Sequence, residues 1–418
     1  MTINRKTSNI KVNVASEIGR LNAVLLHRPG MEIERMTPSN AHEALYSDIL
    51  SKKIVDDEYR YFCGVFEKVT NVFYVPQVLE SLMEDDDLCS SLVTQSCQME
   101  GCEYLIDELM THSTKTLVRE LIEGFPYRKG VDPDGFAQRR YVLRPLYNLF
   151  FTRDASSSMY DSVLINSMSF DVRKRENLIY KAIFKHYFGA EVMNAQEWNA
   201  EARTEGGDVQ IGRDDLLCIG EGIRTNAKGI EFLANTFRNR PKFNIIVQQL
   251  PFQPDSFIHL DMVYTFLDRD RCMVYEPMIK KSSEFAGKST TWIEIDGGKV
   301  RYHECKNILE ALRKVGMEME PVICGGSDLW TQQREQWHSG ANFFALAPGK
   351  VIGYRRNSNT IEALDKAGFS VLNAEDVVEG RVSIDDYNCC VVTFAASELP
   401  RAGGGARCMT MPINRDKI

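Results

Sequence analysis

A pattern that recurs three times constrains the fold of this chain most. A short apolar segment is followed by a loop that contains arginine and then by a segment with helical spacing of its apolar residues. The pattern occurs in "VLINSMSFDVRKRENLIYKAIFKHYFGAEVM" from Val163, "LLCIGEGIRTNAKGIEFLANTF" from Leu216 and "VIGYRRNSNTIEALDKAGFSVLNA" from Val351. Strands that alternate with helices indicate an α/β architecture.

The loop arginines of this pattern are Arg173, Arg224, Arg355 and Arg356. Loops at strand ends carry the binding groups of many α/β folds. These arginines are therefore candidates for a ligand site. The alternative is that each of them only caps or solvates its own loop.

Nine short apolar runs rich in β-branched residues are predicted to be strands. They begin at Asn22, Asn71, Ser162, Leu216, Asn244, Cys272, Val322, Val351 and Cys389. Between residues 77 and 138 this rhythm stops, and apolar residues recur at helical spacing instead. The sequence therefore predicts a helical insertion within a strand-rich chain.

The overall charge argues against some classes of partner. The chain has 418 residues, a formal net charge of -8 at pH 7 and a pI of about 5.6. Binding to nucleic acid needs a basic face, so we expect no nucleic-acid partner. No apolar run approaches the roughly 18 residues of a membrane span, and the N-terminal stretch lacks the apolar region of a secretory signal. We expect no membrane partner.

The cysteines and histidines do not form metal or disulfide patterns. The 11 cysteines are odd in number, and none are spaced as C-x-x-C. We interpret them as free thiols in a reducing compartment, which predicts a cytoplasmic protein. The 7 histidines lack the spacing of metal ligands, and neither a Walker A motif nor G-x-S-x-G occurs. The sequence predicts no metal and no cofactor.

Four short segments concentrate residues that can carry chemistry. They are "NLFFTRD" with Asn148, Phe151, Arg153 and Asp154, "TEGGD" with Glu205 and Asp208, "HLDMVYTF" with His259 and Asp261, and "GGGARCM" with Arg407 and Cys408. Residues i and i+2 of a strand face the same side, so we expect His259 and Asp261 to point into one pocket. The alternatives are a structural His–Asp pair, a solvated turn at "TEGGD" and a surface ion pair at "RD". The last segment is either a loose tail or is folded inward to present Cys408.

Considered together, these residues resemble a nucleophile, an acid–base group and a carboxylate clamp for a cation. A guanidinium is the natural partner of such a clamp, because each carboxylate accepts two parallel N–H bonds from it. A thiolate is a strong nucleophile, and a neighbouring arginine or a bound cation lowers the pKa of its thiol. The set predicts covalent attack on a guanidinium carbon, with a proton donor for the departing ammonia.

At these segments the chain resembles the arginine deiminase family of guanidino-group-modifying enzymes. The resemblance runs in order through "SEIGRLNAVLLHRPG", "NLFFTRD", "VRKRE", "EGGD", "RTNA", "HLD", "GANFFALAPG" and "GGARCMTMP", and so covers nearly the whole length. It implies a five-bladed, pseudo-fivefold α/β propeller. Residues 1–76 and 139–418 would form the catalytic propeller domain, and residues 77–138 would form the helical insertion.

The resemblance also implies a role for each catalytic candidate. Cys408 would attack the guanidinium carbon. His259 would protonate the leaving ammonia and then activate water. Glu205 and Asp261 would orient His259 and the guanidinium, and Asp154 would hold the guanidinium through paired hydrogen bonds.

The same resemblance assigns the substrate-binding residues. Asn148, Arg173 and Arg224 would bind the carboxylate end of the substrate, and Phe151 would line the pocket. Asp208 would support its loop. The implied activity is hydrolysis of L-arginine to L-citrulline and ammonia without a cofactor, by a protein that we expect to be a homo-oligomer.

The sequence departs from the family pattern at a few positions. Ala155 replaces the proline of "FTRDP", Gly403 stands where relatives have an arginine in a mobile loop, and "WHSG" with His338 and Ser339 replaces "WNDG". These departures leave three alternatives open. One is hydrolysis of a modified arginine or another guanidine, the second is transfer of the amidino group to an amine, and the third is a non-catalytic guanidine-binding protein.

Overall fold

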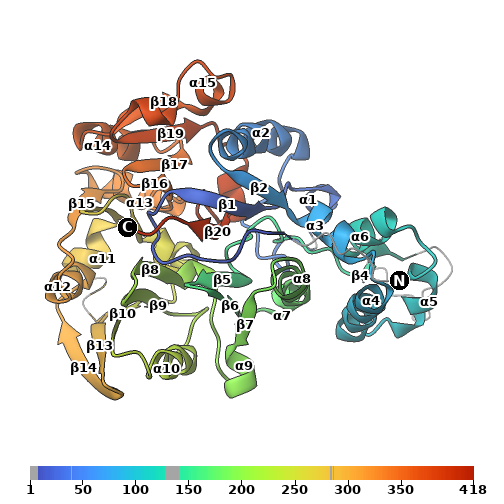
Figure 1. The fold of residues 1–418 in the computed structure, drawn as a ribbon. Coiled ribbons are helices and arrows are strands. Elements are labelled where there is room, and N and C mark those ends of the chain that lie inside the picture. The colour runs from blue at the N-terminus through green and yellow to red at the C-terminus, as the bar shows by residue number, and fades with distance from the viewer. Residues whose placement is uncertain (1–7, 39, 128–140, 283–284, 286) are drawn as a thin grey trace.

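The structure is a computed structural model, and it describes residues 8–38, 40–127, 141–282, 285 and 287–418. Five sheets of three or more strands make up its framework (Figure 1). The strands of these sheets, in spatial order, are β2 (Asn71–Tyr74), β1 (Leu21–Leu26) and β20 (Met411–Arg415); β5 (Ser156–Met159), β6 (Ser162–Ile165) and β7 (Glu191–Asn194); β14 (Lys299–Cys305), β13 (Thr290–Asp296), β10 (Lys242–Gln249), β9 (Leu216–Glu221) and β8 (Val209–Arg213); β11 (Tyr264–Phe266), β12 (Arg271–Val274) and β15 (Glu320–Ile323); and β16 (Phe344–Ala347), β17 (Lys350–Tyr354), β19 (Cys390–Phe394) and β18 (Ser370–Asn373). Each of the nine predicted strands coincides with one of these, which confirms the mixed α/β class.

All five sheets share one pairing pattern. A middle strand pairs antiparallel with one neighbour and parallel with the other. The middle strands are β1, β6, β9, β12 and β17. A parallel pair needs a crossover connection, usually a helix, and this is why each middle strand is followed by a helical segment. The recurring strand–loop–helix pattern of the sequence is thus the middle strand of a sheet followed by the start of its crossover connection.

The helices lie in these crossovers and in one long helical stretch. They are α1 (Met31–Glu34), α2 (Lys52–Val69), α3 (Val75–Leu82), α4 (Asp86–Glu100), α5 (Ile106–Leu109), α6 (Thr114–Glu123), α7 (Asp171–Lys174), α8 (Glu176–Ala182), α9 (Ala195–Trp198), α10 (Ala227–Thr236), α11 (Glu276–Lys280), α12 (Ile308–Lys314), α13 (Leu329–Trp337), α14 (Ser358–Lys366) and α15 (Ala374–Val378). A short two-stranded sheet, β3 (Phe125–Pro126) with β4 (Tyr141–Leu143), follows the helical stretch.

The last strand returns to the first. β20 pairs antiparallel with β1, with Leu25 opposite Met411 and Leu21 opposite Arg415. The backbone N–H of Asp416 also donates to the carbonyl of Arg20 at 2.9 Å. The C-terminal segment is therefore folded inward, and the loose-tail alternative is wrong. Cys408 lies three residues before β20, which is fixed against β1.

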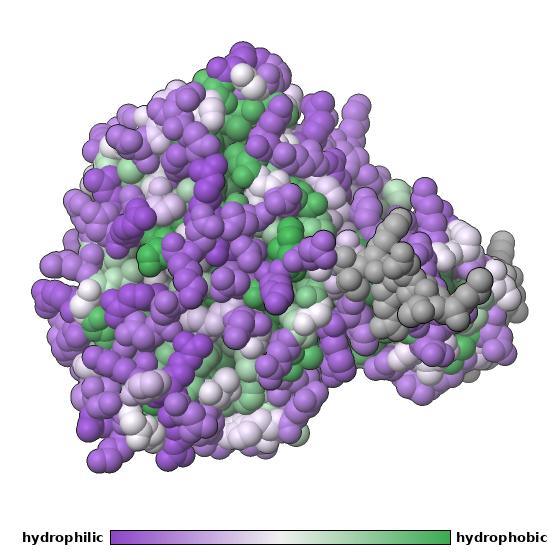
Figure 2. Space-filling model, in the orientation of Figure 1, coloured by the Kyte–Doolittle hydropathy of each residue, from purple (hydrophilic) through white to green (hydrophobic). Residues whose placement is uncertain are grey.

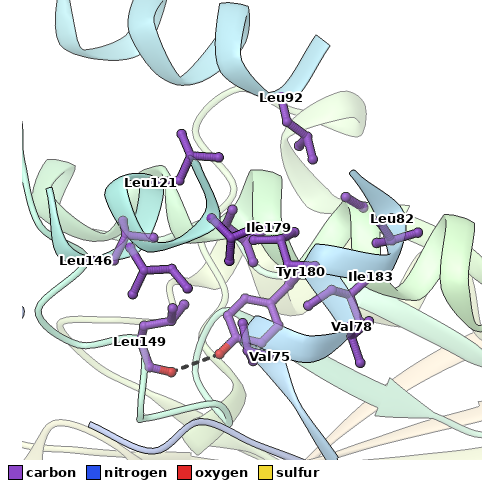
Figure 3. Packing of buried hydrophobic residues seen from close by; sticks show 14 of the residues in the cluster. Val75, Val78, Leu82, Leu92, Leu121, Leu146, Leu149, Ile179, Tyr180 and Ile183 are labelled. Carbon is purple, nitrogen blue, oxygen red and sulfur yellow. Dashed lines mark hydrogen bonds between the residues drawn. The ribbon is translucent and has the colours of Figure 1, made fainter. Parts of the chain in front are cut away.

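The predicted helical insertion corresponds to α3 to α6, which project to one side of the sheets (Figure 1). Their buried side chains do not form a core of their own. Leu121 and Val78 belong to one hydrophobic cluster with Ile179 and Tyr180 of α8, as Figure 3 shows. The hydroxyl of Tyr180 donates to the carbonyl of Leu149 at 3.0 Å in the same region. The end of the predicted insertion at residue 138 lies outside the described residues.

The surface seen in Figure 2 is mostly hydrophilic, with hydrophobic residues gathered in small patches between hydrophilic ones. None of the helices in the described part of the chain is long and apolar enough to cross a membrane.

Candidate active site

Cys408 lies in the loop between the helical turn Leu399–Ala402 and β20. Its side chain is 2% exposed. The side-chain oxygen of Asn342 accepts hydrogen bonds from the backbone N–H groups of Arg407 (2.9 Å) and Cys408 (3.2 Å). The loop passes so close to Phe151 that a β-carbon on Gly404 would overlap the phenyl ring. The glycines of "GGGARCM" therefore bring the thiol loop against the predicted pocket residue.

His259 and Glu205 form a fully buried pair. Nε2 of His259 lies 3.0 Å from Oε2 of Glu205, and their side chains are 1% and 0% exposed. Burial by itself would lower the pKa of His259, but Asp154, Glu205 and Asp208 together raise it to about 9. Burial by itself would raise the pKa of Glu205. Arg224 and His259 oppose this effect and hold that pKa below its usual range. The surrounding carboxylates therefore favour the protonated form of His259.

The expected strand at "HLD" is wrong. His259 is extended, but residues Leu260–Met262 form a helical turn, with the N–H of Met262 donating to the carbonyl of His259 at 3.1 Å. The turn is fixed from the "TEGGD" segment, because Oδ1 of Asp208 accepts the N–H of Leu260 at 2.9 Å. Gly207 is required here, since a β-carbon would overlap the ring of His259. His259 and Asp261 reach the same pocket through a turn and not through strand alternation.

Asp154 is held by a second buried cluster. Its Oδ2 accepts Nη1 of Arg173 at 2.5 Å, and Arg173 also donates from Nε (3.0 Å) and Nη2 (2.8 Å) to Glu176. Oδ1 of Asp154 lies 3.8 Å from Nδ1 of His259. Asp154 therefore connects the histidine to an Arg–Glu pair that fixes its orientation.

Asp261 faces the thiol from another direction. Its Oδ2 accepts Nη1 of Arg407 at 2.8 Å and lies 3.9 Å from Sγ of Cys408, which donates to it. Burial, Asp261 and Asp154 raise the pKa of Cys408 well above its usual value, and Arg407 opposes this only in part. Arg407 does lower the thiol pKa as expected, but burial and the two carboxylates outweigh it, so the thiol is not activated by this arginine alone.

The buried polar atoms of this cluster that have no hydrogen-bond partner among the described residues include Oδ1 of Asp154, Oδ1 of Asp261, Oδ2 of Asp208, Nδ1 of His259 and Nε of Arg224. Buried carboxylate oxygens without donors are costly, so they call for a ligand that carries several N–H groups. The thiol of Cys408 lies 3.9 Å from the other oxygen of Asp261. The pocket can therefore hold a planar cation with N–H donors against a nucleophile.

The predicted substrate-binding residues border this cluster. Nη1 of Arg224 donates to Oε2 of Glu205 at 3.1 Å. Nδ2 of Asn148 donates to the carbonyl of Ala44 at 2.8 Å, and the ring of Phe151 stacks beside Phe150 with centroids 4.1 Å apart. Arg224 lies in the loop between β9 and α10 as expected, whereas Arg173 lies within α7. The structure thus brings all nine predicted site residues into one buried network.

Sequence reasoning missed several members of the network. Glu176 and Asn342 each support a predicted residue through the hydrogen bonds given above. Glu17 is 7% exposed and pairs with Arg407 at 3.0 Å across 390 positions of sequence. Glu176 and Asn342 stand inside quoted segments, but no spacing rule singles them out. Among the residues described here, no group of three or more histidine, cysteine or carboxylate side chains could hold a metal ion.

Comparisons with known proteins agree with this geometry. The family model described as "Arginine deiminase" matches residues 45–415. The arginine deiminase of Listeria innocua is 30% identical over 429 residues, which cover 97% of this chain and 99% of that protein. The arginine deiminase of Mycoplasma capricolum subsp. capricolum is 32% identical over 424 residues, with 98% of each chain covered.

Solved structures with a similar fold are more distant in sequence. The N-terminal domain of ArgZ, an arginine dihydrolase from cyanobacteria bound to its product, has a TM-score of 0.53 and 13% identity, with 94% of this chain and 97% of that chain covered. A dimethylarginine dimethylaminohydrolase bound as an adduct to S-methyl-L-thiocitrulline has a TM-score of 0.51 and 12% identity, with coverage of 94% and 99%.

Proposed function

Because this chain belongs to the arginine deiminase family, we propose that it hydrolyses L-arginine to L-citrulline and ammonia through a covalent intermediate on Cys408. One observation carries the proposal. The unpartnered Oδ1 atoms of Asp154 and Asp261 lie in the same buried cluster as the thiol of Cys408 and the His259–Glu205 pair.

The first step is binding of the guanidinium. Oδ1 of Asp154 and Oδ1 of Asp261 accept N–H groups of the substrate, which satisfies both buried oxygens. The raised pKa of Cys408 means that the thiol is protonated before substrate arrives. The incoming cation offsets the two carboxylates that raise this pKa, so the thiol releases its proton to solvent as the substrate enters.

The chemical steps use His259 twice, first as a protonated acid and then as a neutral base. Sulfur of Cys408 bonds to the guanidinium carbon, and His259 gives its proton to the departing nitrogen, so that the C–N bond breaks and ammonia leaves. Neutral His259 then accepts a proton from water as the oxygen attacks the same carbon. The C–S bond breaks, the sulfur leaves as thiolate, and the remaining hydroxyl proton passes to this thiolate, which forms citrulline and restores the thiol. Glu205 orients His259 and keeps it basic enough for both roles.

The repeated pairing pattern supports a finer description of the fold. We infer that the five sheets are the blades of a pseudo-fivefold α/β propeller, with residues 1–76 and 139–418 as the catalytic domain and 77–138 as an insertion. In this arrangement the middle strands β6 and β9 direct Arg173 and Arg224 toward the same end of the molecule. A cytoplasmic homo-oligomer stays a prediction, which cell fractionation and size-exclusion chromatography with light scattering test.

A second candidate keeps the chemistry and changes the substrate. Gly403 stands where relatives have an arginine in a mobile loop, so this chain lacks one cation that could bind the far end of arginine. Hydrolysis of a modified arginine or another guanidine, or transfer of the amidino group to an amine, uses the same Cys–His–carboxylate set.

One experiment separates these possibilities. The purified protein is incubated with arginine and a panel of other guanidines, and products and quenched protein are analysed by mass spectrometry, with Cys408→Ala as the control. We expect citrulline and ammonia from arginine, and an adduct on Cys408 that retains the amino-acid part of the substrate. An adduct that retains only the amidino carbon indicates transfer, and absence of turnover with every guanidine contradicts the proposal.

A further inference from the structure

The guanidinium of Arg407 is fully buried and uses every one of its N–H donors. Nε and Nη2 donate to the two oxygens of Glu17 at 3.1 and 3.0 Å, and Nη2 also donates to the carbonyl of Val209 at 2.7 Å. Nη1 donates to Oδ2 of Asp261 at 2.8 Å and to the carbonyl of Gly207 at 3.4 Å. A lysine could not satisfy this set, because its ammonium has three donors and no planar fork.

Glu17 anchors the far side of this guanidinium. It belongs to the segment before β1, outside the residues that the family model matches. Its backbone N–H donates to the carbonyl of Ile211 at 2.8 Å, and its Oε1 also accepts the N–H of Ile211 at 3.3 Å. Glu17 is thus fixed to β8 at two points, once through its backbone and once through its carboxylate. Burial by itself would raise the pKa of Glu17, but Arg407 and Arg153 lower it to about 2.

The pair determines how Asp261 is presented. Arg407 occupies Oδ2, so Oδ1 is the oxygen without a partner among the described residues. The charged and titratable groups that act on Asp261 include Arg407, Arg153, His259, Asp154 and Cys408. Burial raises the pKa of Asp261, and Arg407 is the strongest group that opposes this.

We propose that Arg407, held by Glu17, is a positioning residue that fixes the rotamer and the charge of Asp261, so that Oδ1 of Asp261 accepts the guanidinium beside Sγ of Cys408. This inference concerns the same site and rests on the proposed function. Arg407 acts through Asp261 and does not touch the substrate. A carboxylate that becomes protonated or rotates would leave the substrate cation without one of its two partners.

The test compares Arg407→Met, Arg407→Lys and the double variant Glu17→Gln/Arg407→Met with the wild-type protein. Arg407→Met leaves Glu17 and Asp261 buried without their cation, so it loses both stability and rate. In the double variant one orphaned carboxylate is removed, and we expect the melting temperature to recover in part. We expect kcat/KM at pH 7 to stay at least about 100-fold below wild type in both Met variants.

The pH profile separates positioning from a structural role. With the cation removed, Asp261 takes up a proton at higher pH, so the acid limb of kcat/KM moves up by about one pH unit or more in both Met variants. Arg407→Lys keeps the charge and loses the fork, so we expect about a 10-fold loss with the acid limb unmoved.

A second readout does not depend on turnover. The rate at which cationic chloroacetamidine alkylates Cys408 depends on the same carboxylate and should show the same shift of its acid limb. If the double variant recovers stability and regains wild-type kcat/KM and alkylation rates, the inference is wrong even though the proposed function stands. If arginine is not turned over by the wild type, the alkylation profile still decides the role of Arg407.

Discussion

Nε2 of His259 lies 3.0 Å from Oε2 of Glu205 in a region from which solvent is excluded. Because Asp154 and Glu205 raise the pKa of His259 to about 9, the imidazolium is present below that pH and is lost above it. The general acid of the first step is the protonated form. We therefore expect kcat/KM to be maintained up to about pH 9 and to fall above it, which pH–rate measurements on free enzyme and substrate check.

Replacing Glu205 by glutamine should move this limb. The variant loses a charge and a charge-assisted hydrogen bond at His259, so the alkaline limb is expected about one pH unit or more lower, together with a lower kcat. A matched control is Glu294→Gln, since Glu294 lies 3.1 Å from Nε2 of His303 in a more exposed pair. That variant should leave the profile unchanged. A limb that stays in place in Glu205→Gln would show that another group titrates.

The thiol of Cys408 should discriminate between alkylating agents by charge. Burial, Asp261 and Asp154 raise its pKa, so a neutral reagent meets a protonated thiol at pH 7. A cationic amidine satisfies the two carboxylates and favours the thiolate. We expect chloroacetamidine to modify Cys408 at least about 100-fold faster than chloroacetamide, as measured by mass spectrometry over time.

The control for this preference is the pair of variants Asp154→Asn and Asp261→Asn. Each removes one acceptor for the cation and one charge beside the sulfur. The preference for the cationic reagent should shrink in both. Equal rates with the two reagents in the wild-type protein would refute a cation-binding pocket.

The buried Arg173–Glu176 pair should contribute to stability. Glu176 is fully buried, and its two oxygens accept from Nε and Nη2 of Arg173. Glu176→Gln leaves a buried guanidinium with one carboxylate partner fewer, so we expect a loss of about 3 kcal/mol in the free energy of unfolding. Glu197→Gln, in the exposed pair with Lys181, should cost less than about 1 kcal/mol. Urea denaturation of both variants makes the comparison, and equal losses would contradict the role of burial.

Sequence reasoning succeeded where the signal is local. Each of the nine predicted strands is a short apolar run with at least one β-branched residue, a composition that is typical of strands. It failed at "HLD", where alternation suggested a strand but a hydrogen bond from Leu260 to the distant Asp208 stabilises a turn. The pair of Glu17 with Arg407 could not be found either, because it depends on the return of β20 to β1. Local propensity determines the elements, whereas contacts distant in sequence determine the orientation of the site.

Gly404→Ala should damage the pocket more than the fold. A β-carbon there overlaps the ring of Phe151, which must move from its place beside Phe150. Overpacking of this kind costs about 1–3 kcal/mol. We expect KM to rise, because the ring lines the predicted substrate pocket, and steady-state kinetics with arginine measure this. Gly287→Ala is the control, since no atom of the described residues lies within 4 Å of the added carbon, and it should behave as wild type.

Leu121→Ala should destabilise the whole described fold and not only the helical stretch. Leu121 is fully buried in α6 and belongs to the cluster that contains Ile179 of α8 (Figure 3). Removing such a side chain costs about 2–5 kcal/mol.

All four tryptophans, Trp198, Trp292, Trp330 and Trp337, lie outside the stretch from α3 to α6. Tryptophan fluorescence therefore reports on parts of the chain outside this stretch, and circular dichroism reports on all helices. If the cluster couples the two parts, both probes should give one transition that shifts together in Leu121→Ala. Met110→Ala, at a position 38% exposed, should shift neither. A fluorescence transition that stays at the wild-type midpoint in Leu121→Ala would instead show that the helical stretch unfolds as a separate domain.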